Sequence, residues 1–132
     1  MTGRNNLRSL PDERASVLVV DDEEAILRIY VKLLTRAGLR CFTATSALHA
    51  LEILGEQSVN LVLTDNRMPG PSGLDLLAVV AERWPKTGRI LMTALLDSEL
   101  ALKARNHHRV LPKDLSSAML VDIICREARR ER

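Results

Sequence analysis

Two kinds of apolar pattern alternate along the chain. Continuous apolar runs rich in β-branched residues predict strands buried on both faces, and the clearest of them cover residues 16–20 and 61–64. Between these runs, apolar residues recur at three- and four-residue intervals, a spacing that predicts helices with one buried face. The alternation occurs five times, so the sequence predicts five strand–helix units after a polar N-terminal stretch.

Turn-forming and capping residues set the bounds of these elements. Gly38 and Gly55 are predicted to end the first two helices, and Pro85 to end the third. Serines are placed to cap three helices: Ser46, Ser72, and either Ser116 or Ser117. The predicted strands are residues 16–20, 39–44, 61–64, 89–92 and 109–111. The predicted helices are 24–37, 47–54, 72–84 with Leu74, Leu77, Ala78 and Ala81 on its apolar face, a weak charged helix at 95–105, and a last helix with Met119, Leu120, Ile123 and Ile124.

Strands that alternate with helices predict a parallel sheet covered on both faces. Five such units favour a single-domain, flavodoxin-like (βα)5 three-layer sandwich of class α/β, with strand order 2-1-3-4-5. Residues 39–44 mix polar and apolar side chains, as expected for an edge strand. We expect a flexible leader at residues 1–15, one folded domain at 16–128, and a basic tail or the start of a linker at 129–132.

Composition narrows the class of protein. Hydrophobic residues make up 46% of the 132 residues, enough for a core, and the net charge is only +2. Arginines near the two ends carry much of the positive excess, and we interpret them as solvated tails rather than a nucleic-acid patch. Cys41 and Cys125 are predicted to be free thiols in a reducing compartment. Without a hydrophobic leader or a run long enough to cross a bilayer, the sequence predicts a cytoplasmic protein.

The candidate chemistry follows the predicted strands. Ligands of open α/β sheets bind at the carboxyl ends of the strands, so residues just after each strand should share one rim. Three carboxylates ~4 Å apart repel by roughly 4 kcal/mol per pair at an effective dielectric of ~20, and they need a compensating cation. Oxygen ligands with open positions favour Mg²⁺ over Ca²⁺, and a carboxylate can act as a nucleophile toward phosphorus. The residues concerned are Asp21 and Asp22 after the first strand, Asp65 after the third, Thr93 after the fourth and Lys113 after the fifth.

The order of these motifs resembles the response-regulator receiver domain of the CheY-like superfamily, over about residues 15–128. The matching text is Val-Val-Asp-Asp-Glu at 19–23, Leu-Thr-Asp-Asn-Arg-Met-Pro-Gly at 63–70 with Ser-Gly at 72–73, Leu-Met-Thr-Ala at 91–94, and Leu-Pro-Lys at 111–113. The resemblance implies a two-component phosphorelay switch in which a sensor histidine kinase, or a phosphotransfer protein, phosphorylates this domain.

The resemblance also implies a role for each site residue. Asp65 is the expected phosphoacceptor. Asp22, Asp65 and the backbone carbonyl of Arg67 are expected to bind Mg²⁺ directly, and Asp21 through a water molecule. Thr93 and Lys113 are the expected switch residues, and the small Ala94 leaves the phosphoryl site open. Output is expected through a downstream protein partner or a C-terminal output domain, with no direct contact to nucleic acid or membrane, and dimerisation stays open.

Departures from the family pattern keep other interpretations open. Asp114 follows the switch lysine where the family usually has a cis proline, so a trans peptide bond is expected there. Val110 stands where an aromatic residue is common, and the stretch from Thr93 to Lys113 is short. A pseudo-receiver that binds a partner without phosphorylation is therefore the alternative. An aspartate-nucleophile phosphatase or a flavin protein on the same topology ranks last, because the phosphate loop and Asp-x-Asp motif are missing.

Overall fold

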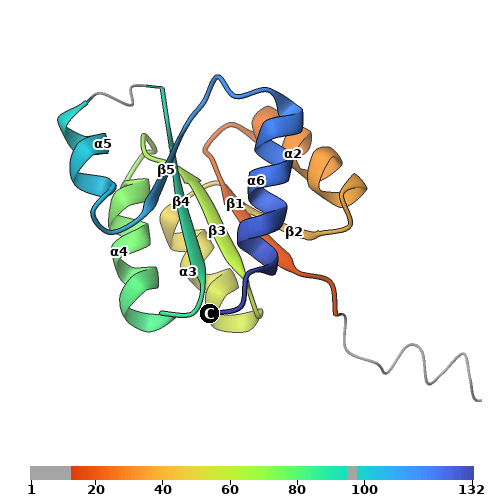
Figure 1. Cartoon of the computed structure of the whole chain (residues 1–132). Coiled ribbons are helices and arrows are strands. Elements are labelled where there is room, and N and C mark those ends of the chain that lie inside the picture. The colour runs from red at the N-terminus through yellow and green to blue at the C-terminus, as the bar shows by residue number, and fades with distance from the viewer. Residues whose placement is uncertain (1–12, 95–97) are drawn as a thin grey trace, which may run out of the picture.

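The computed structural model describes residues 13–94 and 98–132, and it confirms the predicted α/β architecture. Five parallel strands form one sheet in the order β2-β1-β3-β4-β5, with helices on both faces (Figure 1). The strands are β1 (Ser16–Val20), β2 (Arg40–Ala44), β3 (Leu61–Asp65), β4 (Gly88–Thr93) and β5 (Arg109–Pro112). The helices are α2 (Glu24–Arg36), α3 (Ala47–Glu56), α4 (Gly73–Arg83), α5 (Glu99–Ala104) and α6 (Ser117–Arg129).

The sheet separates two hydrophobic cores. Val17 and Val19 of β1 point to one face and pack in a cluster with Leu34 of α2 and Ile124 of α6. Leu18 and Val20 of β1 and Leu91 of β4 point to the other face and pack against α3 and α4. All five residues of β1 are buried, which explains why this strand is a continuous apolar run rather than an alternating one.

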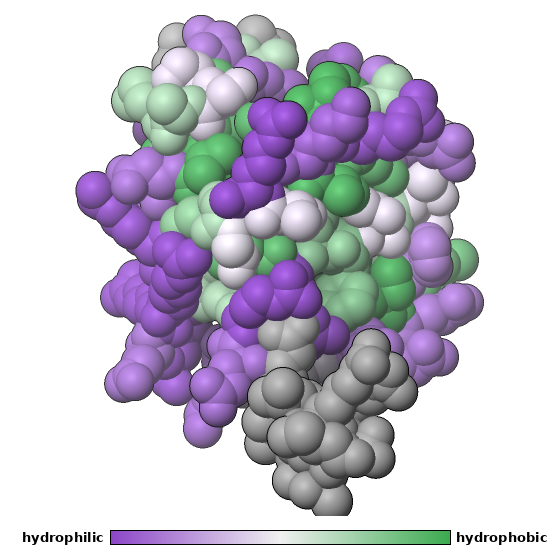
Figure 2. All heavy atoms as spheres, turned by 90° about the vertical axis from the view of Figure 1, so that its right-hand side faces the viewer, coloured by the Kyte–Doolittle hydropathy of each residue, from purple (hydrophilic) through white to green (hydrophobic). Residues whose placement is uncertain are grey.

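Strand β2 lies at the edge of the sheet, as predicted. Four of its five residues are only half-buried, and the Arg40 guanidinium lies 5.1 Å from the centroid of the Phe42 ring. Figure 2 views the molecule from the side where β2 and α2 lie in Figure 1, and it shows hydrophobic side chains at the surface there. The charged side chain over the edge strand limits pairing of this strand with another chain.

Serine caps were predicted correctly. Ser46, Ser72 and Ser116 each accept a hydrogen bond from a backbone N–H in the first turn of the following helix. At Ser72 the cap is reciprocal, because the Asp75 carboxylate accepts from the Ser72 N–H at 3.1 Å. Gly38 ends α2 with a φ of 88°, a conformation that glycine adopts without strain.

Three predicted details of the helices are wrong. Helix α3 runs through Gly55 to Glu56, because this glycine keeps a helical backbone and the helix ends one residue later. On α4 the buried face contains Leu76 and Val80, whereas Ala78 is exposed. Met119 of α6 is also exposed, since the buried stripe of that helix starts at the next residue. In each case the packing of the whole helix, rather than the single apolar residue or glycine, determines where the helix ends or which side chains are buried.

The charged helix predicted at 95–105 is shorter in the structure. Helix α5 spans Glu99–Ala104 and is capped by Ser98, while residues 95–97 lie outside the described residues. Most of the predicted leader, residues 1–12, also lies outside them. Among the residues that the structure describes, no helix is long and apolar enough to cross a membrane. Cys41 and Cys125 are free and half-buried, as predicted.

The C-terminal arginines are more ordered than solvated tails would be. Helix α6 continues through Arg129, whose guanidinium donates to the carbonyl oxygen of Ala37 at 3.0 Å. Arg132 folds back onto Glu127 with an N–O distance of 2.8 Å, and only 19% of its side chain is exposed. The interpretation as a solvated charge is therefore wrong for the Arg132 side chain, whereas Arg129 remains exposed.

Candidate functional site

Three carboxylates gather at the carboxyl ends of β1 and β3. In the register of these two strands Val20 pairs with Thr64, so the residues that follow lie side by side. One carboxylate oxygen from each of Asp21, Asp22 and Asp65 lies within 4.8 Å of the others. The Asp65 side chain is 13% exposed, whereas Asp22 is exposed to solvent. The acid cluster predicted from the sequence is therefore present, and it opens to solvent on one side.

The electrostatics of Asp21 reflect this crowding. Burial raises the pKa of its carboxyl above the usual value, and the charges of Asp65 and Asp22 raise it further. The Glu23 backbone N–H, which donates to Asp21 Oδ1 at 2.9 Å, and the Lys113 ammonium both oppose the rise in pKa. A site that opposes the ionisation of the Asp21 carboxyl favours a bound cation.

Lys113 supplies positive charge at the same rim. Its Nζ lies 2.8 Å from Asp65 Oδ1, and the lysine side chain is 43% exposed. The Lys113 backbone N–H donates to the carbonyl oxygen of Thr93 at 3.0 Å, which ties the end of β5 to the end of β4. Asp65, Thr93, Ala94 and Lys113 line one hollow of about 330 Å³. The structure thus brings together the residues predicted for the phosphoryl site.

Arg67 lies in the loop between β3 and α4. It lines the hollow that contains Asp65 and also a shallower one that contains Asp22. The predicted metal-binding carbonyl therefore belongs to a residue that borders both carboxylates.

Asn66 and Gly73 hold this loop in place, and the sequence interpretation did not assign them a role. Asn66 Oδ1 accepts from the Leu74 N–H at 3.0 Å, and the Asn66 carbonyl accepts from the Gly73 N–H at 3.0 Å. A Cβ added at Gly73 would lie 2.1 Å from the carbonyl oxygen of Asp65. The sequence does contain a sign of this close approach: a glycine directly follows the Ser72 cap, at a helix position that does not require glycine.

A second cavity, of about 350 Å³, extends from the acid cluster between α2 and α6. Its lining includes Asp21, Asp65 and Lys113 at one end and Tyr30, Leu33 and Leu120 further in. Burial raises the pKa of Tyr30 to about 12, and the charges of Asp21 and Asp65 contribute. The sequence placed Tyr30 only on the apolar face of its helix, so its closeness to the carboxylates was missed.

The predicted departures from the family pattern have visible structural counterparts. No peptide bond in the described residues is cis, as expected for Lys113–Asp114. Val110 is half-buried and packs against the core on the α3 and α4 side. Surface loop histidines were expected at 107 and 108. His107 is exposed, but His108 is half-buried, and its Nδ1 accepts from Arg89 Nε at 3.1 Å.

Comparisons with known proteins give a consistent result. A family model described as the response regulator receiver domain matches residues 17–125. The transcriptional regulator NtrC of Escherichia coli is 38% identical over 92 residues, which cover 70% of this chain and 20% of NtrC. The response regulator protein FleR of Pseudomonas aeruginosa is 31% identical over 116 residues, which cover 86% of this chain and 24% of FleR. The chain thus spans about a quarter or less of the length of these relatives.

Solved structures agree with the sequence relatives. A response regulator receiver domain from Clostridium thermocellum superposes with a TM-score of 0.79 at 31% identity, covering 86% of this chain and 94% of that one. The response regulator TrrA of Thermotoga maritima, solved in complex with Mg²⁺ and a beryllium fluoride, gives a TM-score of 0.76 at 26% identity, covering 85% of this chain and 97% of that one. The fold, the order of the rim residues and these matches lead to one conclusion. The chain belongs to the response regulator receiver domain family of two-component systems.

Proposed function

We propose that this domain accepts a phosphoryl group on Asp65 from a sensor histidine kinase or a phosphotransfer protein. The observation that carries the proposal is the position of the Asp65 carboxylate, which lies close to two other carboxylates and to an ammonium group. One oxygen from each of Asp21 and Asp22 lies within 4.8 Å of an Asp65 oxygen, and Lys113 Nζ lies 2.8 Å from Asp65 Oδ1. A nucleophile placed between a cation-binding cluster and a fixed positive charge suits phosphoryl transfer, which depends mainly on positioning and charge neutralisation.

The residues present fit Mg²⁺. The cluster offers only oxygen ligands, and it is open to solvent at Asp22, so water can complete an octahedral shell. We propose that Asp22, Asp65 and the Arg67 carbonyl hold the ion directly and Asp21 through water. When bound, the ion neutralises charge on the transferred phosphoryl group.

In the proposed transfer, an oxygen of the Asp65 carboxylate attacks phosphorus while the P–N bond to the imidazole of the donor histidine breaks. The imidazole leaves with the electron pair of that bond and takes up a proton, and Asp65 becomes an acyl phosphate. Lys113 pairs with one phosphoryl oxygen and Thr93 donates a hydrogen bond to another. Both contacts shift the β4 and β5 loops toward the phosphoryl group.

Output is proposed to pass through a downstream protein partner or an output domain. NtrC is a DNA-binding transcriptional regulator of which this chain matches 20%, so the remaining length of that relative lies outside the matched region. We infer a cytoplasmic signalling role in which the receiver itself touches neither nucleic acid nor membrane.

Intact-mass spectrometry after incubation with acetyl phosphate and Mg²⁺ tests the proposal. The native protein should gain one phosphate that hydroxylamine removes, and Asp65→Asn should gain none. Asp114→Asn is the matched control, because Asp114 is an exposed carboxylate on the neighbouring loop and should leave labelling unchanged. Equal labelling of the Asp65 variant and the native protein would exclude Asp65 as the acceptor.

The second candidate is a pseudo-receiver, favoured by Asp114 after the switch lysine and by Val110 in place of an aromatic side chain. Hydrogen exchange with and without beryllofluoride, a phosphoryl mimic, separates the two. A switching receiver should change its hydrogen exchange between Ala94 and Lys113, where the two loops respond to the mimic. If the mimic binds and this segment exchanges identically, the pseudo-receiver is the better description.

A further inference from the structure

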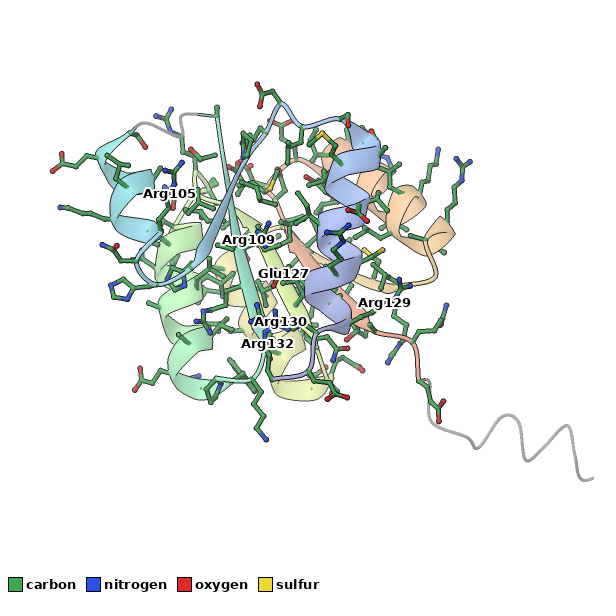
Figure 3. The ribbon with its side chains drawn as sticks, in the orientation of Figure 1. Arg105, Arg109, Glu127, Arg129, Arg130 and Arg132 are labelled. Carbon is green, nitrogen blue, oxygen red and sulfur yellow. The ribbon has the colours of Figure 1, made fainter. Side chains whose placement is uncertain are left out.

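A basic hollow lies at the end of the sheet opposite the acid cluster. It is formed where β4 and β5 begin, beside the last residues after α6, and its volume is about 600 Å³. Figure 3 labels Arg105 directly after α5, Arg109 at the start of β5, and Arg130 and Arg132 in the C-terminal segment. Two carboxylates, Glu127 and Glu131, also line it, so positive charges exceed negative ones by three. The arginines of the basic hollow are Arg89, Arg105, Arg109, Arg130 and Arg132.

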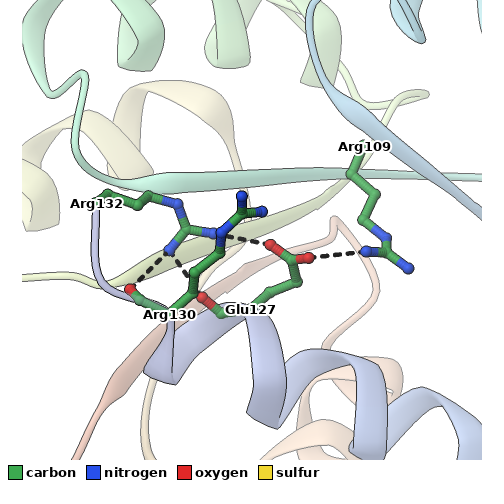
Figure 4. Close-up of polar contacts among 4 residues, drawn as sticks. All are labelled: Arg109, Glu127, Arg130 and Arg132. Carbon is green, nitrogen blue, oxygen red and sulfur yellow. Dashed lines mark hydrogen bonds and ion pairs between the residues drawn. The ribbon is translucent and has the colours of Figure 1, made fainter.

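One carboxylate forms ion pairs with two of these arginines. Glu127 Oε1 lies 2.8 Å from Arg109 Nη1, and Glu127 Oε2 lies 2.8 Å from Arg132 Nη2 (Figure 4). The Glu127 side chain is 13% exposed. Each of its two oxygens is thus paired with an arginine.

Among the residues that the structure describes, Arg89 donates only to neutral acceptors. Its Nε donates to His108 Nδ1 at 3.1 Å, and its Nη2 donates to the carbonyl oxygen of His107 at 3.3 Å. Burial lowers the pKa of the Arg89 guanidinium, and the charge of Arg132 lowers it further. Burial and the Arg89 charge likewise lower the pKa of His108. The wall of the hollow therefore contains like charges that repel one another.

Arg105 and Arg130 complete the set. Within the described residues neither side chain makes an ion pair, and both residues are exposed. Five planar guanidiniums thus face one concave space, and three of them lack a carboxylate partner in the described part of the chain. Guanidinium groups bind phosphate with two parallel hydrogen bonds, a geometry that neither lysine nor histidine reproduces.

We propose that the basic hollow binds an oligophosphate, a small anion with two or more linked phosphate groups. Its volume lies within the range of small-molecule sites, roughly 300–1,000 Å³. Nucleic acid fits less well, because the whole chain carries a net charge of only +2. The site is separate from Asp65 and does not depend on phosphorylation there.

Calorimetric titration in Mg²⁺-free buffer tests the proposal, with inorganic tripolyphosphate and ATP as probes. The double variant Arg105→Ala/Arg130→Ala should lose affinity for both by about a hundredfold, since each of the two removed charge-assisted contacts is worth on the order of tenfold. The matched control is Arg28→Ala/Lys32→Ala, which removes two exposed cations from α2 and should bind as the native protein does. An equal loss in both double variants would show general charge attraction and overturn the proposal.

The probes also distinguish the source of the anion. Equal binding of tripolyphosphate and ATP supports recognition of the phosphates alone, and tighter binding of ATP supports a nucleotide. Amide chemical shifts in the native protein should move at residues 88–89 and 105–109 and not at Asp21 or Asp65, a measurement that needs no variant. Shifts confined to the acid cluster would refute the site. If duplex DNA or vesicles with anionic lipid bind more tightly than the small anions, and the Arg105/Arg130 variant loses that binding, the ligand of the hollow is a macromolecule or membrane and the proposal is wrong.

Discussion

Gly73→Ala should damage the phosphoacceptor site although Gly73 carries no functional group. Gly73 is the first residue of α4, directly behind the loop that follows Asp65. A Cβ at this position would lie 2.1 Å from the Asp65 carbonyl oxygen, 2.9 Å from its carbonyl carbon and 3.0 Å from Asn66 Cα. All three neighbours are backbone atoms, so no side-chain rotation relieves the clash.

The size of the effect follows from these contacts. A Cβ essentially never approaches closer than 3.0 Å, so the loop or the helix must move by at least 0.9 Å, the difference from 2.1 Å. Overpacking of this kind costs about 1–3 kcal/mol, and alanine returns about 0.5–1 kcal/mol of helix propensity. The shift also stretches the two hydrogen bonds from Gly73 and Leu74 to Asn66, each worth about 1 kcal/mol. We expect a net loss of about 2–3 kcal/mol in the free energy of unfolding.

Activity should fall with stability, because a displacement near 1 Å at a reacting group costs up to about a hundredfold in rate. Urea unfolding measures the stability, and the rate of acetyl phosphate labelling at Asp65 measures the activity. Gly55→Ala is the matched control: it lies inside α3 with nothing within 4 Å of an added Cβ. It should gain about 0.5–1 kcal/mol and label normally. Native stability and labelling in Gly73→Ala would refute the reasoning.

Three further predictions concern other residues. Asp22→Ala should bind Mg²⁺ more weakly by calorimetry yet melt at a higher temperature without metal, because one of three repelling carboxylates is gone; unchanged Mg²⁺ affinity would rule out direct ligation. The Cys41 thiol, whose pKa burial raises to about 11 from 9.0, should be alkylated slowly at pH 8, where its thiolate fraction is only ~0.1%. Because the folded protein holds the Cys41 proton more tightly than the unfolded chain does, this thiol's contribution to folding stability is complete below about pH 9 and is lost as the pH rises through about 11. Cys41→Ala should therefore lose less folding stability at alkaline pH than the native protein does. Asp114→Pro should leave labelling of Asp65 largely intact while changing hydrogen exchange in the β5 loop; loss of labelling would show that this loop shapes the acid site itself.

Much of the fold was predictable because its signals are local. The β-branched runs of β1 and β3 fix two central strands, and a serine before each of three helices supplies its cap. Parallel topology then places the residues after each strand at one rim, which is why the acid cluster and Lys113 could be assigned before the structure was known.

The unpredicted features depend on contacts between distant segments. Glu127 joins Arg109, 18 residues earlier, to Arg132, and nothing in the local pattern marks that pairing. Glycine is needed at position 73 because the backbone of Asp65, at the end of the preceding strand, lies too close for a Cβ. The sequence shows the glycine but does not show this contact. The helical spacing correctly placed Tyr30 on the apolar face of α2. Only the packing of α2 against α6 shows that it lies near the carboxylates.

The sheet between the two hydrophobic cores has a thermodynamic consequence. Leu34 belongs to the core under α2 and α6, and Leu77 to the core under α3 and α4; both are fully buried. Because the two side chains lie on opposite faces of β-structure and share no cluster, truncations of the two should be additive to within about 0.5 kcal/mol. One core can therefore be redesigned for stability while the other keeps its original packing.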